Sequence, residues 1–160
     1  MKFSLLIFLL LIPAHATCME KADFVLVIKS ESILYLKRGG KILKEFHVVF
    51  GRHPKGRKLK EGDERTPEGR YMLDYKKEDS AFHKSIHISY PNIKDQRQAK
   101  ELGVNPGGQI MIHGQKNGAV WPASITRLFN WTDGCIALSN GDMDEVWDAV
   151  DAGTPILIEP

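Results

Sequence analysis

Short apolar runs broken by turns fill the first third of this chain, and they restrict it to a fold built on a sheet. Residues 24–28 and 33–36 are β-branched and apolar, and the polar residues 29–32 between them predict a hairpin. Two adjacent glycines, able to take a positive φ, predict a second turn at residues 37–40. Residues 42–50 then alternate as a third strand. This pattern is typical of a β-meander.

Further strands and a few short helices are expected along the rest of the chain. Residues 140–152 carry an apolar stripe at helical spacing, with acidic residues in the first turn and Gly153 as the stop. A second helix is expected at residues 93–102 and a helical turn at 124–129. The result is a mainly β fold, a β-rich α+β class. Its later strands are expected at residues 70–75, 86–90 and 109–112, near 135, and at 155–158.

Length and charge limit the organisation and the partners of the chain. Its 160 residues suffice for one domain, and its net charge of +2 gives no electrostatic reason to expect a nucleic-acid ligand. Residues 52–65 form a polar loop with six basic and three acidic side chains. Because no aromatic residues interleave there, a solvated loop is expected rather than a site for phosphate or an anionic polymer.

The N-terminus has the pattern of an export signal. A lysine at position 2 precedes an apolar run at residues 5–12, and Ala14 and Ala16 bracket a histidine in the manner of a cleavage site. Residues 1–16 are therefore expected to be a signal peptide. Residues 17–160 are expected to be a single exported domain without stable membrane insertion, because the apolar run is short for a span. The alternatives are an uncleaved anchor and lipidation at Cys18, for which the preceding residues match poorly.

Cys135 is the only cysteine in the body of the chain, because Cys18 stands at the edge of the export signal. Structural cysteines of exported proteins usually occur in pairs, so an unpaired Cys135 indicates chemistry. His113, 22 positions upstream, is the candidate base. Gly134 allows backbone N–H groups to come close to an oxyanion. The alternative is a buried core cysteine with no catalytic role.

The combination of these motifs resembles the catalytic signature of the L,D-transpeptidase family of peptidoglycan enzymes (YkuD; ErfK/YbiS/YcfS/YnhG). His-Gly at 113–114 is followed by Thr-Asp-Gly-Cys-Ile at 132–136, and the opening hairpin fits the family as well. So do Arg-Thr-Pro-Glu-Gly at 65–69 and His-Ile-Ser-Tyr-Pro at 87–91. The resemblance runs from about residue 22 to residue 160, and it is nearest to the YafK-like branch.

The resemblance implies a β-sandwich with short helices and acyl transfer through a Cys135 thioester. His113 would be the base, oriented by the carbonyl of Gly114. Thr132, Asp133 and Gly134 would hold the oxyanion or the substrate, with Asp133 a second candidate partner for the imidazole. The substrates would be peptidoglycan stem peptides in the periplasm or cell envelope, and a monomer without a cofactor is expected.

Two positions depart from the family pattern. Asp133 stands before Gly134, where a His or Arg is common. Most members have Arg or Asn two residues after the cysteine, where this chain has Ala137. The loss of that group leaves three interpretations open: an L,D-transpeptidase, a hydrolase on the same scaffold, and a wall-binding module without activity. The hydrolase would be an L,D-carboxypeptidase or an enzyme that cuts a cross-link or tether. The intact Cys135 and His113 disfavour the third interpretation.

The other histidines and the aromatic residues of the loop before Cys135 are assigned structural roles. No short-spaced pair of ligands predicts a metal site. The remaining histidines are expected to lie away from the motif. Trp121, Phe129 and Trp131 either cover the cleft or anchor their loop, and the second interpretation is favoured. These histidines are His47, His53, His83 and His87.

Overall fold

The fold was analysed in a computed structural model, which describes residues 20–119 and 122–160. The expected signal peptide at residues 1–16, Cys18 and Trp121 lie outside the described residues. None of the helices in the described part of the chain is long and apolar enough to cross a membrane.

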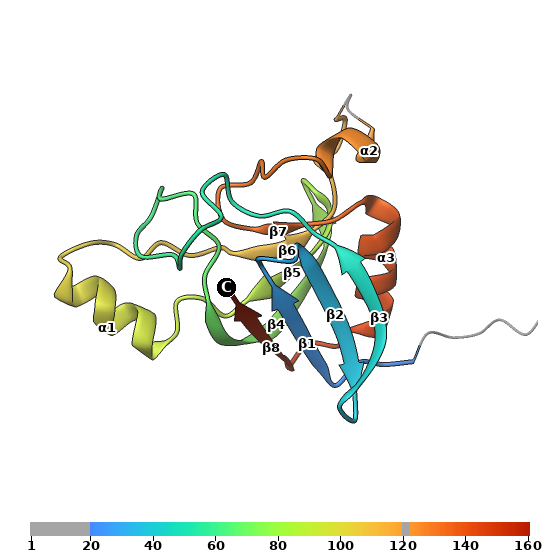
Figure 1. Ribbon diagram of the computed structural model, residues 1–160, viewed down its shortest axis with the longest axis horizontal. Coiled ribbons are helices and arrows are strands. Elements are labelled where there is room, and N and C mark those ends of the chain that lie inside the picture. Colours follow the sequence, from blue (N-terminus) through green and yellow to red (C-terminus); the bar gives the residue numbers. More distant parts are fainter. Residues whose placement is uncertain (1–19, 120–121) are drawn as a thin grey trace, which may run out of the picture.

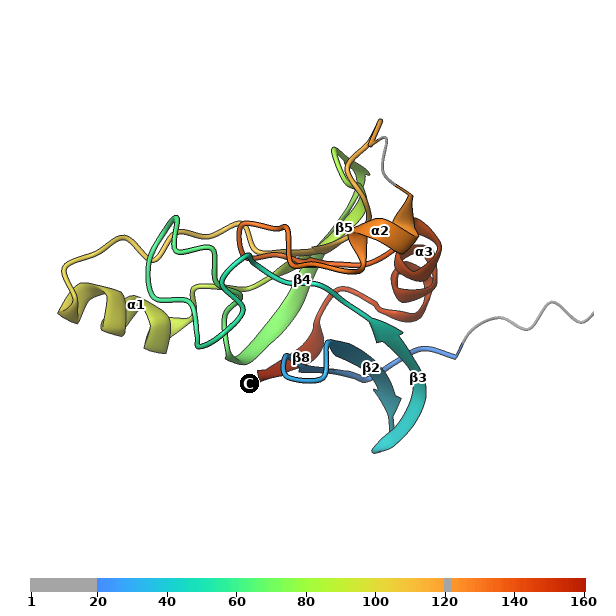
Figure 2. The ribbon, with the colours of Figure 1, turned by 45° about the horizontal axis from the view of Figure 1, so that its top comes forward.

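The described strands form one eight-stranded sheet in the order β3-β2-β1-β8-β4-β5-β6-β7. The β1–β8 and β6–β7 pairs are parallel and the others are antiparallel. The sheet curls strongly, so that β1, β2 and β3 form one layer and β4 and β5 rise away from it (Figures 1 and 2). The strands are β1 (Phe24–Ile28), β2 (Ile33–Arg38), β3 (Lys41–His47), β4 (Gly69–Ser80), β5 (His83–Ile88), β6 (Met111–His113), β7 (Ile136–Ala137) and β8 (Thr154–Glu159).

Alternation along the strands builds the core of the molecule. In β1 and β2 every second residue is buried, and these side chains pack in one cluster with residues of β4, β5, β6 and β8. Both halves of the curled sheet therefore share a single apolar interior. The prediction of a mainly β fold with a few short helices is confirmed.

The two edges of the sheet meet beside the expected site. After β3 the chain continues as an extended segment, and Val49 pairs with Ala137 of β7 in an isolated antiparallel bridge. Gly51 pairs with Thr132 two residues farther on. The third strand expected at residues 42–50 is therefore β3, which ends at His47. Beyond it, Val49 contacts the segment that carries Cys135.

The helices begin where polar caps favour them. Asn92 caps α1 (Ile93–Glu101) in a capping box with Asp95, and Ser139 caps α3 (Asn140–Ala149) by accepting from the Asp142 N–H. The predicted helical turn is α2 (Ala123–Thr126), which is shorter than the expected 124–129. In Figure 1, α1 projects at one side, and α3 lies beside β5 and β6.

The expected end of α3 at Gly153 is wrong by several residues. The helix ends at Ala149, and Val150 is already extended. Lys76 of β4 donates to the carbonyl oxygens of Trp147 and Val150 at 2.5 and 3.0 Å. A cation from a distant strand thus bonds to two carbonyls at the end of the helix, while the carbonyl of Ala149 accepts from the Ala22 N–H at 2.8 Å. The local sequence pattern does not reveal these contacts.

Three of the other strands differ in length from the expectation. β4 runs to Ser80 rather than residue 75, because its two ends pair with different neighbours, β8 and β5. β5 begins at His83 and ends at Ile88, before the expected residue 90, and β6 is confined to three residues. The long β4–β5 hairpin carries Phe82 to the expected site.

A core substitution tests the shared interior. Leu34 in β2 is fully buried, so Leu34→Ala removes apolar contacts and leaves a cavity. We expect a loss of about 2–5 kcal/mol in the free energy of unfolding, measured by chemical denaturation. Ile42 in β3 is 58% exposed, and Ile42→Ala is the matched control with a change within about 0.5 kcal/mol. Equal losses in the two variants would contradict this description of the core.

Candidate active site

Two neighbouring strands position the two residues that the sequence singles out. β6 ends at His113, β7 begins one residue after Cys135, and the strands run parallel with His113 opposite Ala137. Because side chains alternate along strands, Cys135 and His113 lie on the same face. Both residues line a cavity of about 560 Å³, here called the larger cavity. The parallel pairing therefore brings the candidate base and the candidate thiol together.

His113 is held in one orientation. Its ring is buried, with 4% of the residue exposed, and Nδ1 lies 2.6 Å from the carbonyl oxygen of Gly114. A carbonyl oxygen only accepts, so Nδ1 carries the proton and Nε2 is left as the basic nitrogen. Burial lowers the pKa of His113, although the bond to Gly114 opposes this shift. The imidazole is therefore kept neutral.

Gly114 follows His113 in a space that no side chain could share. A Cβ at this position would lie 2.6 Å from Asn140 Oδ1 and 2.9 Å from His83 Cβ. The expectation that His83 lies away from the motif is therefore wrong. Its Nε2 lies 2.8 Å from Asp144 Oδ1, which directs the ring toward α3. His83 thus packs behind Gly114 and supports it.

Two aromatic rings pack against His113 on the wall of the larger cavity. Phe82 lies 4.6 Å from the imidazole and Trp131 lies 5.7 Å away, measured between ring centroids. The favoured interpretation of Trp131 as a loop anchor is incomplete, because the side chain also lines the cavity. Phe129, by contrast, is 53% exposed. No local pattern identifies Phe82, since only the β4–β5 hairpin brings it to this place.

Cys135 is partly buried and has two contacts with backbone groups. Its Sγ accepts from the Met111 N–H at 3.4 Å and lies 3.7 Å from the Gln109 carbonyl oxygen. Within residues 20–119 and 122–160, no hydrogen bond joins Sγ to His113. Burial raises the pKa of the Cys135 thiol, the Met111 N–H lowers it, Asp133 raises it and Lys58 lowers it. Burial thus favours the neutral thiol, and a transfer of its proton to His113 would require a closer approach of the two side chains.

The turn before Cys135 is held by Thr132. Its Oγ1 donates to the Cys135 carbonyl oxygen at 2.7 Å and accepts from the Gly134 N–H at 3.2 Å. Gly134 has φ +132°, and a Cβ there would lie 2.7 Å from Arg65 O. Only glycine fits this position. Because the Gly134 N–H is already bonded, the N–H of Cys135 is the turn's candidate donor to an oxyanion.

Asp133 does not contact His113. Its side chain is 79% exposed, and Oδ1 pairs with Arg52 at 3.0 Å. Arg52 also pairs with Glu64 at 2.5 Å, so one guanidinium links the turn to the loop at residues 52–65. The suggestion that Asp133 is a carboxylate partner of the imidazole is therefore wrong, since Gly114 fills that position.

A second cavity of about 310 Å³, here called the smaller cavity, also opens at Cys135. Residues 107–110, Asp133 and part of the loop at residues 52–65 line it, and Lys58 is among them. The expectation that this loop is merely solvated is wrong, because Lys58 and Asp63 form a buried ion pair at 2.9 Å. The loop is thus a wall of the site.

The comparison with known proteins follows this geometry. The sequence profile of the YkuD family, described as the L,D-transpeptidase catalytic domain, matches residues 22–158. This chain belongs to that family.

Curated relatives that match this chain are longer proteins. This chain is 29% identical over 133 residues to the protein named "Putative L,D-transpeptidase YafK" of Escherichia coli strain K12. The matched region covers 79% of this chain and 46% of that protein. The chain thus spans about half the length of the curated relatives it matches.

Solved structures of the family share the fold. The helical cell shape determining protein Pgp2 of Campylobacter jejuni is 29% identical, with a TM-score of 0.61 over 88% of this chain and 48% of that one. An L,D-transpeptidase from Xylanimonas cellulosilytica matches with a TM-score of 0.56 at 16% identity, covering 87% and 61%. The second similarity concerns the fold alone.

The described residues contain no group of three or more His, Cys, Asp or Glu side chains that could hold a metal ion. His113 and Cys135 each have a hydrogen bond to the backbone, at Gly114 and at Met111.

The close approach at Gly134 can be tested by adding one methyl group. Gly134→Ala places a Cβ 2.7 Å from Arg65 O at a φ of +132°, so the turn must move. We expect the rate of alkylation of Cys135 to differ from that of the wild-type protein and the melting temperature to fall. Gly153→Ala is the control, because it has φ +93° but nothing within 4 Å of its Cβ. Its cost is limited to backbone strain of about 1–2 kcal/mol, and its Cys135 should react normally.

The burial of His113 and the partial burial of Cys135 also predict a pH dependence. Because burial lowers the pKa of His113, the imidazole stays neutral to lower pH than an ordinary histidine, whose pKa is about 6.5. The acid limb of kcat/KM is therefore expected below that value. Because burial raises the pKa of Cys135, its alkylation by iodoacetamide should rise at higher pH than that of N-acetylcysteine. Fast alkylation that persists at acidic pH would instead show a resting thiolate–imidazolium pair.

Proposed function

We propose that this chain is an exported, cysteine-dependent enzyme that acts on peptidoglycan stem peptides through a Cys135 thioester. One observation carries the proposal. His113 has its Nδ1 fixed by Gly114 O at 2.6 Å, and it shares the larger cavity with Cys135. A neutral imidazole with a free Nε2 beside a thiol is the arrangement that nucleophilic catalysis by cysteine needs.

The proposed first step is attack on an amide carbonyl. The Cys135 thiol gives its proton to His113 Nε2 while Sγ bonds to the carbonyl carbon, and the carbonyl oxygen becomes an oxyanion. The Cys135 N–H is placed to donate to that oxygen. As the intermediate collapses, His113 returns the proton to the leaving amine, the C–N bond breaks and a thioester remains. Gly114 O stabilises the imidazolium throughout.

The second step decides the class of reaction. A neutral amine of another stem or of a protein attacks the thioester in transfer, and water attacks in hydrolysis. In either case His113 takes a proton from the attacking group and Sγ leaves as the thiol. Family membership supports transfer as the first candidate. Ala137, which has no basic side chain to bind an acceptor, keeps hydrolysis as the second.

The location and the cellular role belong to the same proposal. The expected signal at residues 1–16 would place the enzyme in the periplasm or cell envelope as a monomer, where stem peptides are available. A role in cell shape is supported by the structural similarity to Pgp2, which is described as a helical cell shape determining protein.

Product analysis on purified muropeptides tests this function. Joined stems indicate transfer, and shortened or uncoupled stems indicate hydrolysis. We expect Cys135→Ser and His113→Ala to lower either activity by roughly a thousandfold or more while the protein stays folded. His47→Ala is the control, because His47 is exposed on β3. Unchanged turnover in the Cys135 variant would exclude the thioester.

A further inference from the structure

The two cavities meet at Cys135 but differ in character. Gln109, Asp133 and Cys135 line both, whereas only the larger cavity contains His113 and its aromatic neighbours. Lys58 lines the smaller cavity together with Glu61, Glu64 and Asp133, whereas the basic residues of the larger cavity are Arg52, Lys77 and Lys116. A ligand that reaches into the smaller cavity from Cys135 therefore meets Lys58 in its wall.

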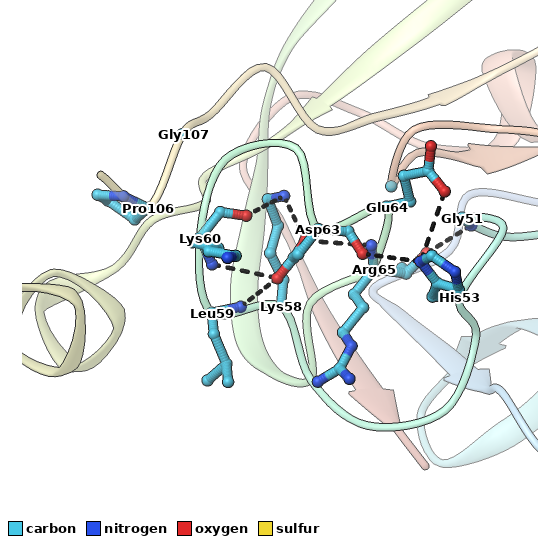
Figure 3. Close-up of polar contacts among 12 residues, drawn as sticks. Gly51, His53, Lys58, Leu59, Lys60, Asp63, Glu64, Arg65, Pro106 and Gly107 are labelled. Atoms are coloured by element: carbon cyan, nitrogen blue, oxygen red, sulfur yellow. Dashed lines mark hydrogen bonds and ion pairs between the residues drawn. The ribbon is translucent and has the colours of Figure 1, made fainter. Parts of the chain in front are cut away.

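Lys58 is buried to an unusual degree for a lysine. Its side chain is 3% exposed, and Nζ donates to Asp63 Oδ1 at 2.9 Å and to Lys60 O at 3.0 Å (Figure 3). An ammonium group has three hydrogens to donate. The third hydrogen has no partner within residues 20–119 and 122–160. A buried charge with an unused donor is costly unless a ligand completes its contacts.

The carboxylate of Asp63 accepts hydrogen bonds from the backbone as well as from Lys58. Its Oδ2 accepts from the N–H groups of Leu59 and Lys60 at 2.7 and 3.1 Å, and Oδ1 accepts from the Arg65 N–H at 3.2 Å (Figure 3). Three backbone donors thus stabilise the carboxylate in addition to Lys58. The ammonium group is consequently held in place by Asp63 and keeps capacity for a second anion.

The acidic residues of the smaller cavity are engaged elsewhere. Glu64 and Asp133 both pair with Arg52, at 2.5 and 3.0 Å. Glu61 is exposed, and its Oε2 accepts from Asn105 Nδ2 at 2.8 Å. These groups lie in water or in ion pairs and are screened, whereas Lys58 acts in a medium of low dielectric. They favour a ligand with one carboxylate over one with several.

We propose that Lys58 binds the terminal carboxylate of the residue that follows the scissile bond, a contact that Ala137 cannot make. The identity of that bond rests on the proposed function. Only the amide nitrogen and one α-carbon separate the attacked carbonyl from such a carboxylate. A carboxylate bound by Lys58 would therefore lie next to Cys135, and the smaller cavity would hold the leaving amino acid.

Two alkylating reagents test the binding of a carboxylate without any turnover. Iodoacetate and iodoacetamide react with Cys135 in the same way, the thiolate displacing iodide, but only iodoacetate carries a carboxylate. Their rate ratio cancels any change in the fraction of thiolate. We expect Lys58→Met to lower the iodoacetate-to-iodoacetamide ratio by about tenfold or more, from the loss of a charged hydrogen bond. Rates are read at Cys135 by peptide mass mapping.

Lys29→Met is the matched control. The Lys29 side chain is also 3% exposed and pairs with Glu68 at 2.6 Å, but it does not line the smaller cavity. Its ratio should stay at the wild-type value. Lys116 lines the larger cavity. A fall in the ratio in Lys116→Met and not in Lys58→Met would place the carboxylate in the larger cavity and overturn the proposal.

A double variant guards against misfolding. Lys58→Met alone leaves Asp63 as a buried charge, whereas Lys58→Met with Asp63→Asn removes both charges of the pair. The ratio should fall in the double variant as well. An unchanged ratio in a folded double variant would exclude carboxylate binding by Lys58.

A substrate pair separates this inference from the proposed function. The wild-type protein should process a stem tetrapeptide with a lower KM than its C-terminal carboxamide, and the double variant should lose that preference by about tenfold or more. Preference for the carboxamide would show that repulsion by Glu61, Glu64 and Asp133 outweighs attraction by Lys58, against the proposal. If neither peptide is processed, the proposed function fails, while the reagent ratio still decides the role of Lys58.

Discussion

The close approach of backbone segments fixes the geometry at Cys135, and the rest of the site depends on it. The Thr132 N–H donates to Phe50 O at 3.2 Å, which bonds the turn to the segment after β3. A Cβ on Gly51 would lie 2.0 Å from Glu64 O and 3.1 Å from the Cα of Gly134. Three segments far apart in sequence thus pack with no side chain between them. Any residue larger than glycine would separate the turn from the loop that carries Lys58.

This packing explains why the charges of the site can differ from those of free side chains. His113 and Cys135 are each desolvated, so burial favours the neutral form of both. A resting pair of Cys135 thiolate and His113 imidazolium would lose solvation on burial. The hydrogen bonds to Met111 and Gly114 compensate for this loss only in part. In the proposed mechanism, charge is created instead when a substrate displaces water and offers an oxyanion to the Cys135 N–H. In the buried Lys58–Asp63 pair, by contrast, three N–H groups of the loop backbone stabilise the Asp63 carboxylate.

The sequence predicted those features that depend on neighbours along the chain. The apolar runs of β1 and β2, the two-glycine turn and the start of α3 follow local rules, and the spacing of His113 and Cys135 carried the family resemblance. Features set by distant contacts were missed. Lys76 ends α3 from another strand, Phe82 reaches His113 only through the β4–β5 hairpin, and the burial of Lys58 depends on how its loop folds back.

Ala137 gives β7 no cation at this site, so a positive charge near Cys135 comes from another segment of the chain. Ala137 is 2% exposed and lies between Val49 and His113, bonded to the backbone of Val49. A lysine supplied by a loop approaches Cys135 from the smaller cavity, on the side without His113. In the role proposed for Lys58, this separation would let a positive charge bind a carboxylate without raising the cost of protonating His113.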